Sequence, residues 1–308
     1  MPTVTSAPHL TEPIESIYET GMSSFSLDSF NVFSTLPDVQ GYTDQRDVAL
    51  NQAGVRQVNM PLQVRQGNHD PQPVQAKVTL SVGLAAADKG THMSRFIILL
   101  EQWSKTHVFS MNPAVLLKEL KQYLGAPTAY LKIDFRYFMD KAAPVSGMSA
   151  RMAYDCTLEG SLDAHDQLRV NAGLAIACAT LCPCSKEISD YGAHNQRAEI
   201  RARINLADPI TLSWDELITA LEETSSCPVY PLIKRSDEKY ITEKAYNNPK
   251  FVEDVIRDAT LSLRQCQGVS GFRLEVEALE SIHAHNAWAA HAENFVPVTG
   301  AEHGIWHP

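Results

Sequence analysis

The sequence contains no apolar run that approaches the roughly 18 residues a helix needs to cross a bilayer. Its N-terminus, MPTVTSAPHLTEPIES, also lacks the basic region and the apolar core of a secretory signal peptide. Hydrophobic residues make up 44% and charged residues 20% of the 308 residues, so the chain can bury a sizeable core. We therefore expect a globular cytoplasmic protein that has no membrane partner.

Cysteine is sparse, and its spacing is not that of a secreted disulfide framework. Two of the thiols, Cys182 and Cys184, are too close in sequence for an unstrained disulfide, so reduced thiols or metal ligands are the better prediction. The six cysteines are Cys156, Cys178, Cys182, Cys184, Cys227 and Cys266.

Positive charge is also scarce, because the formal net charge is -10. Nucleic-acid-binding proteins usually carry a basic footprint, so we expect no nucleic-acid partner. A small anionic substrate is still compatible with this charge, but a local cationic pocket must then bind it despite the net negative charge of the protein.

The first 70 residues are rich in Ser, Pro, Thr, Asn and Gln and show little periodicity. We predict an N-terminal arm with short ordered pieces over residues 1–70. After it the pattern predicts a strand, two helices and two strands. These elements cover residues 74–84, 92–106, 112–125, 129–139 and 149–162.

A similar order follows in the second half of the chain, although no repeat is visible letter by letter. Strands are predicted at 168–181, 197–206 and 271–285, and helices at 213–224 and 251–268. The fold class is therefore α+β, with an antiparallel sheet and a helix pair on one face of each module. We place the first module at residues 71–163 and the second at 164–308, which carries most of the candidate site.

Thiols and imidazoles recur in this second module. Strand alternation across GFRLEVEALESIHAHN would put His283 and His285 on one face, together with Glu275 and Glu277. If residues 180–184 are extended, Cys182 and Cys184 share a face too. Sulfur and nitrogen ligands suit zinc, and an added carboxylate widens the choice to iron or manganese. The alternative is a polar strand face with ordinary buried cysteines.

Several longer motifs resemble one enzyme family. CPCSKEIS and YGAHNQR follow each other at 182–197, KGTHMSRF lies upstream at 89–96, and CPVYPLIKRSDEKYITEKAYNNPKFVED and SIHAHNA lie downstream. These blocks, in this order, resemble GTP cyclohydrolase type IB. The resemblance runs from about residue 38 to 290 and leaves residues 1–35 outside.

The resemblance implies a tunnelling fold (T-fold) of two fused modules, and a homotetramer whose active sites lie at subunit interfaces. It implies that GTP and water give 7,8-dihydroneopterin triphosphate and formate, the first step of tetrahydrofolate and pterin biosynthesis. It also implies one divalent metal per active site, Zn, Mn or Fe, which would activate the water that attacks guanine C8.

The resemblance also implies residue roles. Metal ligands would be Cys184, His194, Glu238 and His283. Cys184, His285 and Cys182 would be catalytic, with His285 the general acid/base and Cys182 the weaker candidate. Which member of the Cys182/Cys184 pair and of the His283/His285 pair binds metal stays open.

Substrate contacts follow in the same way. Glu253 would accept hydrogen bonds from N1–H and the exocyclic amine of guanine, and its alternative role is to complement the dipole of a helix N-terminus. Triphosphate contacts would come from cationic side chains in or beside the motifs. These are Lys186, Arg197, Lys234, Arg235, Lys239, His92 and Arg95.

Two rival functions remain at this level. One is a nitrile reductase of the same fold, in which a cysteine forms a covalent thioimide and NADPH supplies hydride. The other is a non-catalytic protein with a closed structural zinc site of Cys and His ligands.

Overall fold

A computed structural model describes residues 37–66, 69–207, 209 and 213–298. The chain divides into an N-terminal unit, Met1–Val39, and a larger unit, Gln40–Pro308. Residues 1–36 of the predicted arm lie outside the described residues. A short 3₁₀ helix, η3 (Val39–Gly41), falls at the boundary, and every other element among the described residues belongs to the larger unit.

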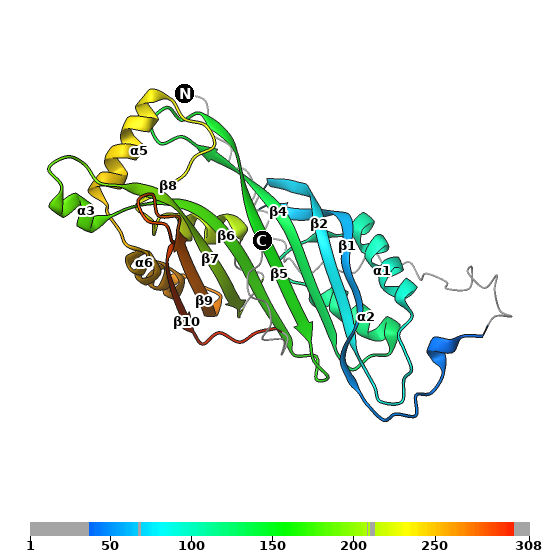
Figure 1. The fold of residues 1–308 in the computed structure, drawn as a ribbon. Coiled ribbons are helices and arrows are strands. Elements are labelled where there is room, and N and C mark those ends of the chain that lie inside the picture. The colour runs from blue at the N-terminus through cyan, green and yellow to red at the C-terminus, as the bar shows by residue number, and fades with distance from the viewer. Residues whose placement is uncertain (1–36, 67–68, 208, 210–212, 299–308) are drawn as a thin grey trace, which may run out of the picture. The chain divides into compact units, whose positions relative to one another are not determined.

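The larger unit is built on one sheet (Figure 1), with the strand order β10-β9-β7-β6-β5-β4-β2-β1-β3 and β8 paired to β6. Neighbouring strands are antiparallel, except that β1 and β3 are parallel. The strands are β1 (Leu50–Gln66), β2 (His69–Leu84), β3 (Val108–Phe109), β4 (Ala129–Ala142), β5 (Ser149–Leu162), β6 (Leu168–Leu181), β7 (Asn195–Leu206), β8 (Cys227–Pro228), β9 (Val269–Ala278) and β10 (Ala287–Glu293).

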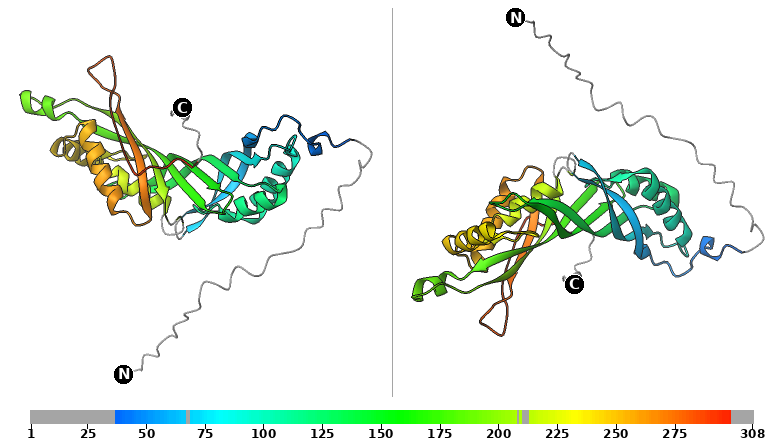
Figure 2. Two further views of the ribbon diagram at one scale, coloured as in Figure 1. Left: turned by 90° about the horizontal axis from the view of Figure 1, so that it is seen from below. Right: turned by 90° about the horizontal axis from the view of Figure 1, so that it is seen from above.

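Among the residues that the structure describes, six α-helices connect these strands. They are α1 (Met93–Thr106), α2 (Ala114–Leu124), α3 (Pro183–Ile188), α4 (Trp214–Glu222), α5 (Arg235–Asn247) and α6 (Val252–Gln265). Figure 2 shows α1 and α2 over one half of the sheet and α6 over the other. In the described part of the chain, no helix is long and apolar enough to cross a membrane.

Local sequence signals fix the helix ends. Helix α2 stops at Gly125, whose φ of 63° is the left-handed conformation that glycine adopts without strain. Helix α4 starts at Ser213, where Ser213 and Glu216 exchange hydrogen bonds in a capping box. These signals explain why the sequence predicts both helices well.

One continuous core lies between the sheet and the helices. In β7 the alternate residues Ala198, Ile200 and Ala202 are fully buried, and they belong to the same core cluster as the buried side chains of α4 and α6. The core also joins the halves, because Trp214 of α4 packs edge-on against Phe135 of β4 with ring centroids 5.4 Å apart. The two halves therefore share a core across the middle of the sheet.

The opposite face of the sheet is polar. Arg201 of β7 contacts the carboxylates of Glu199, Glu275 and Glu277 at 2.6, 3.1 and 3.1 Å. The strand alternation that buries one face thus leaves charged side chains on the other.

The α+β class with a large antiparallel sheet is confirmed. The predicted strands and helices occur in the predicted order, but β1, β3, β8, β10, α3 and α5 were not predicted. The division into two modules and the T-fold name stay proposals.

Two boundaries were predicted wrongly. The 17-residue strand β1 lies inside the predicted arm and pairs with β2. Its alternation is hidden because the register shifts three times along this pair. Strand β9 ends at Ala278 rather than at 285, because the chain turns there to pair back as β10.

Candidate active site

The segment from Cys182 to His194 leaves the sheet after β6 and returns to it as β7. Its ends are closed by main-chain bonds, since Cys182 N–H donates to the His194 carbonyl at 3.1 Å. His194 N–H in turn donates to Ser185 Oγ at 3.0 Å. The fold therefore brings Cys182 beside His194, although eleven residues lie between them in sequence.

The two thiols of this segment have different settings. Cys182 is half-buried and caps α3, because its Sγ accepts a hydrogen bond from Ser185 N–H at 3.4 Å. Cys184 is exposed on α3 itself. Residues 180–184 are not extended as predicted, because α3 begins at Pro183, a residue preorganised for the first helical position.

His194 is held by polar neighbours that the sequence did not predict. Its Nδ1 lies 2.9 Å from Gln196 Oε1 and 3.9 Å from Glu280 Oε2. Gln196 is itself fixed by Thr180 Oγ1 at 3.0 Å and Glu280 Oε1 at 3.4 Å. A histidine anchored through one ring nitrogen presents the other as a ligand, as metal-binding histidines do. The sequence offered one indication that Glu280 belongs to the site, because this residue directly precedes the SIHAH motif.

His283 and His285 lie in the exposed loop between β9 and β10, not on a strand. Their rings still stack, with centroids 5.2 Å apart and planes 21° from parallel. The base of the loop is tied to the Cys182–His194 side of the sheet, because Leu279 N–H donates to the Arg197 carbonyl at 2.9 Å. The pair is thus kept together by a loop conformation and not by strand alternation.

Helix α5 touches this region at its C-terminal end. Lys186 Nζ contacts the Tyr246 carbonyl at 2.5 Å and lies 4.4 Å from the Tyr246 ring centre. Glu238 is exposed at the other end of the helix, eight residues earlier, or about 12 Å along its axis. In the described part of the chain, no three His, Cys, Asp or Glu side chains form a group that could hold a metal.

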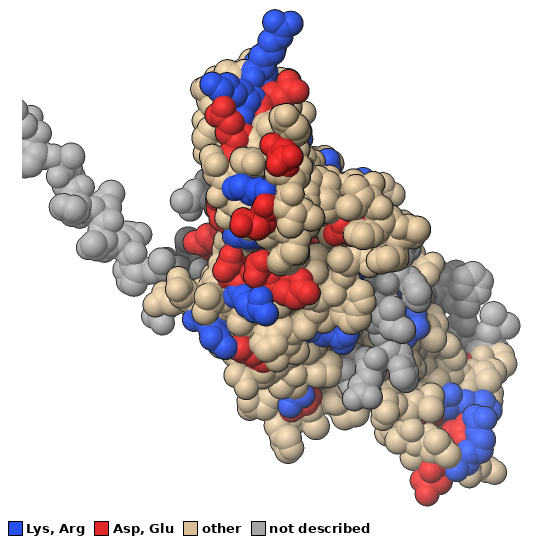
Figure 3. All heavy atoms as spheres, turned by 60° about the vertical axis from the view of Figure 1, so that its left-hand side comes forward, with Lys and Arg blue, Asp and Glu red and all other residues tan. Residues whose placement is uncertain are grey.

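The remaining predicted substrate residues are spread over several surfaces. Glu253 is exposed in the first turn of α6, beside Asp254, which accepts a hydrogen bond from Phe251 N–H at 3.0 Å. The exposed cations are Arg197, Lys234, Arg235 and Lys239. On the face that Figure 3 shows, positive and negative side chains are interspersed rather than gathered by sign.

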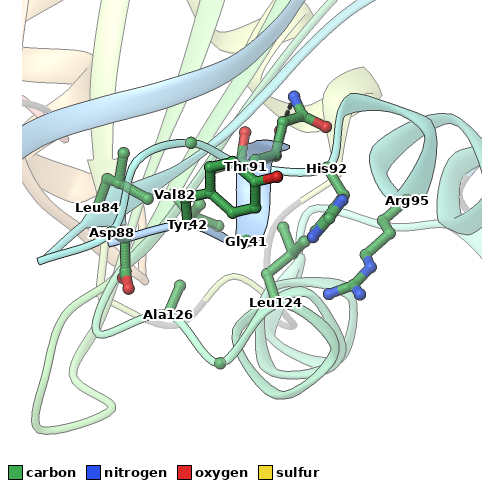
Figure 4. Close-up of a pocket in the computed structure, with 14 residues that line it drawn as sticks. Gly41, Tyr42, Val82, Leu84, Asp88, Thr91, His92, Arg95, Leu124 and Ala126 are labelled. Carbon is green, nitrogen blue, oxygen red and sulfur yellow. Dashed lines mark hydrogen bonds between the residues drawn. The ribbon is translucent and has the colours of Figure 1, made fainter. Parts of the chain in front are cut away.

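His92 and Arg95 line a separate cavity of about 240 Å³ (Figure 4). It lies between the start of α1, the end of β2 and the turn after α2, with Gln40–Tyr42 on one side. Helices α1 and α2 pack on β1, β2, β4 and β5, whereas α5 packs on β6 and β8. Within one chain, this cavity and the Cys182–His194 segment therefore belong to different halves of the sheet.

Comparison with known proteins identifies the chain. A family profile described as type I GTP cyclohydrolase FolE2 matches residues 36–289. GTP cyclohydrolase FolE2 of Geobacter metallireducens is 42% identical over 258 residues, covering 83% of this chain and 97% of that protein. The Bordetella pertussis protein of the same name is 41% identical over 254 residues, with coverages of 82% and 95%.

Among solved structures, uricase from Arthrobacter globiformis matches with a TM-score of 0.47 and 8% identity, over 84% of this chain and 96% of that one. The sequence matches decide against the nitrile reductase and the structural zinc protein. The chain belongs to the type I GTP cyclohydrolase FolE2 family and acts as a GTP cyclohydrolase.

Proposed function

We propose that the chain is a metal-dependent GTP cyclohydrolase of the type IB class, with the T-fold. It converts GTP and water into 7,8-dihydroneopterin triphosphate and formate for folate and pterin biosynthesis. The observation that carries the site assignment is the closed Cys182–His194 segment, in which His194 is anchored beside Glu280. The rest of the site is assigned through the motifs.

The donor chemistry of the site fits a divalent transition metal. Cys184 offers an exposed thiol, His194 and His283 offer imidazoles, and Glu238 offers an exposed carboxylate. Such a mixed S, N and O set suits zinc, iron or manganese, which when bound would supply activated water at guanine C8.

Side chains of the protein supply the proton transfer and the substrate contacts. His285, stacked beside His283, delivers a proton to guanine N7, and Cys182 supports Cys184. Glu253 holds the guanine edge, and the cationic side chains bind the triphosphate.

The distribution of these residues favours an assembly. The cavity at His92 and Arg95, the Glu238 end of α5 and the Cys182–His194 segment lie apart within one chain. In a homotetramer with sites at subunit interfaces, different copies supply these parts to one site. Light scattering on the purified protein tests this assembly, and a monomer that turns over GTP would contradict it.

Removing the metal should abolish turnover. Dialysis against a chelator, with the residual metal measured, is expected to stop the release of formate and of the fluorescent pterin. Adding back zinc, manganese or iron should restore different rates, since the mixed donor set is not strongly selective. Full activity after verified metal removal would contradict the proposal.

Replacing Glu253 by glutamine should weaken GTP binding by roughly tenfold to several hundredfold. The amide places a donor against the donors of the guanine edge, and such a mismatch costs about 1–3 kcal/mol, and more where a charged group is lost. Metal content should stay the same. The measurements are GTP affinity, metal stoichiometry and melting temperature.

Asp254→Asn is the matched control, because Asp254 caps the same helix turn through the Phe251 N–H. This variant should lose about 1 kcal/mol of stability or less and keep its GTP affinity. If Glu253→Gln behaves in the same way, Glu253 only complements the helix dipole.

A further inference from the structure

A buried carboxylate stands at the start of α5, in the middle of an exposed stretch. Asp237 has 0% of its surface exposed, whereas the residues at 234–236 and 238–240 are all exposed. Asp237 has no role predicted from its sequence motif, although four neighbours in this stretch, Lys234, Arg235, Glu238 and Lys239, are candidate site residues.

The carboxylate of Asp237 accepts four hydrogen bonds. Oδ1 accepts from the main-chain N–H groups of Val145 and Ser146, both at 2.8 Å. Oδ2 accepts from Ser146 Oγ at 2.6 Å and from Lys234 N–H at 2.8 Å. Asp237 thus joins the first turn of α5 to the tip of the β4–β5 hairpin, about ninety residues away in sequence.

A second buried contact holds the same hairpin against the segment that leads into α5. Lys141, at the end of β4, pairs with Glu222 at 2.6 Å and lies 4.8 Å from the ring centre of Tyr230. Glu222 also accepts a hydrogen bond from Tyr154 of β5 at 2.7 Å. The hairpin is therefore held on both sides of its tip.

We infer that Asp237 is a positioning residue of the GTP cyclohydrolase site, which fixes the first turn of α5 and its side chains Lys234, Arg235 and Glu238 against the β4–β5 hairpin. This inference rests on the proposed function, which places those side chains in the site. The inference means that the β4–β5 hairpin, in the first half of the chain, helps to position active-site residues of the second half.

The four donors explain why a carboxylate is required here. An asparagine has one acceptor oxygen and one NH₂ group. Two of the four hydrogen-bond donors that surround Asp237 would therefore face the NH₂ group, which cannot accept them. The turn would then move to relieve the mismatch. A shift of about 1 Å in a positioned catalytic group is enough to cost about 100-fold in rate.

The test is Asp237→Asn in the full-length, metal-loaded protein. We expect kcat to fall by about 10–100-fold, with a smaller change in KM, because Glu238 is displaced from its working position. Hydrogen exchange of the main chain should speed up at both 143–148 and 233–239. Metal content per chain should be measured alongside.

Asp163→Asn is the matched control. Asp163 also accepts two main-chain hydrogen bonds at a hairpin turn, from His165 at 2.8 Å and Gln167 at 2.9 Å, but it lies between β5 and β6. This variant should lose stability and keep kcat and KM. If Asp237→Asn keeps wild-type kcat, or if Asp163→Asn loses as much, the inference is overturned.

Three further variants complete the test and separate the inference from the proposed function. Ser146→Ala removes only the hydrogen bond from Ser146 Oγ to Asp237 and should lower kcat by several-fold. This variant tests the inference if Asp237→Asn does not fold, and wild-type kcat in Ser146→Ala would then overturn the inference.

Glu238→Gln and Lys234→Ala test the assignment of α5 side chains to the site. If both keep full activity while Asp237→Asn loses it, the α5 assignment fails and Asp237 acts elsewhere.

Discussion

Replacing Cys184 by alanine should abolish GTP turnover and leave a folded protein. Changes to groups that merely support a metal ligand cost about 10–100-fold, so the loss of a ligand thiolate should exceed about 100-fold. The fold should survive, because Cys184 is exposed on α3 and belongs to no described core cluster. Turnover, metal stoichiometry and melting temperature are the measurements.

Cys178→Ala is the control for Cys184→Ala. Cys178 is fully buried in β6, and burial raises the pKa of its thiol to about 12, so it is a core side chain and not an accessible thiolate. This variant should lose stability through a small cavity and keep its turnover per folded molecule. Wild-type activity in Cys184→Ala, or its failure to fold, would refute the assigned role.

Replacing Lys141 by methionine should destabilise the protein by about 3–5 kcal/mol. The substitution removes one partner of the buried pair with Glu222 and leaves that carboxylate without its cation. Both side chains are less than 10% exposed, so water cannot compensate for the loss. Urea unfolding, followed by fluorescence, measures the change.

The double variant Lys141→Met/Glu222→Gln should recover part of this loss. The glutamine carries no charge, and its oxygen can still accept the hydrogen bond from Tyr154. A loss below about 1 kcal/mol for Lys141→Met, or no recovery in the double variant, would mean that the pair does little for stability.

Several elements could be predicted because their signals are local. Helices α1, α2, α4 and α6 show the helical period, and α2 and α4 also carry their own end signals. From Arg197 to Leu206, strand β7 alternates strictly between polar and apolar residues. Strand β1 could not be found in this way, because register shifts against β2 interrupt its pattern.

The candidate site was predictable only as a set of motifs. The sequence brings Cys182, Cys184 and His194 within thirteen residues, but strand alternation misplaced the thiols and the histidine pair. Helix α3 begins at Pro183, and the chain turns after Ala278, so neither pair lies on a strand. Local propensity cannot reveal where a hairpin closes, because its partner strand decides that.

The sequence by itself determined the family, the α+β class and the residue types at the site, because these depend on composition, period and motif order. Only the tertiary structure revealed the contacts between distant segments. Asp237 in RSDEK looks like any charged residue of an exposed helix turn, yet it is buried by a hairpin about ninety residues earlier. His194 likewise gained Glu280 as a neighbour through the pairing of β7 with β9. Such partners are chosen by packing in three dimensions, and no local pattern in the chain encodes them.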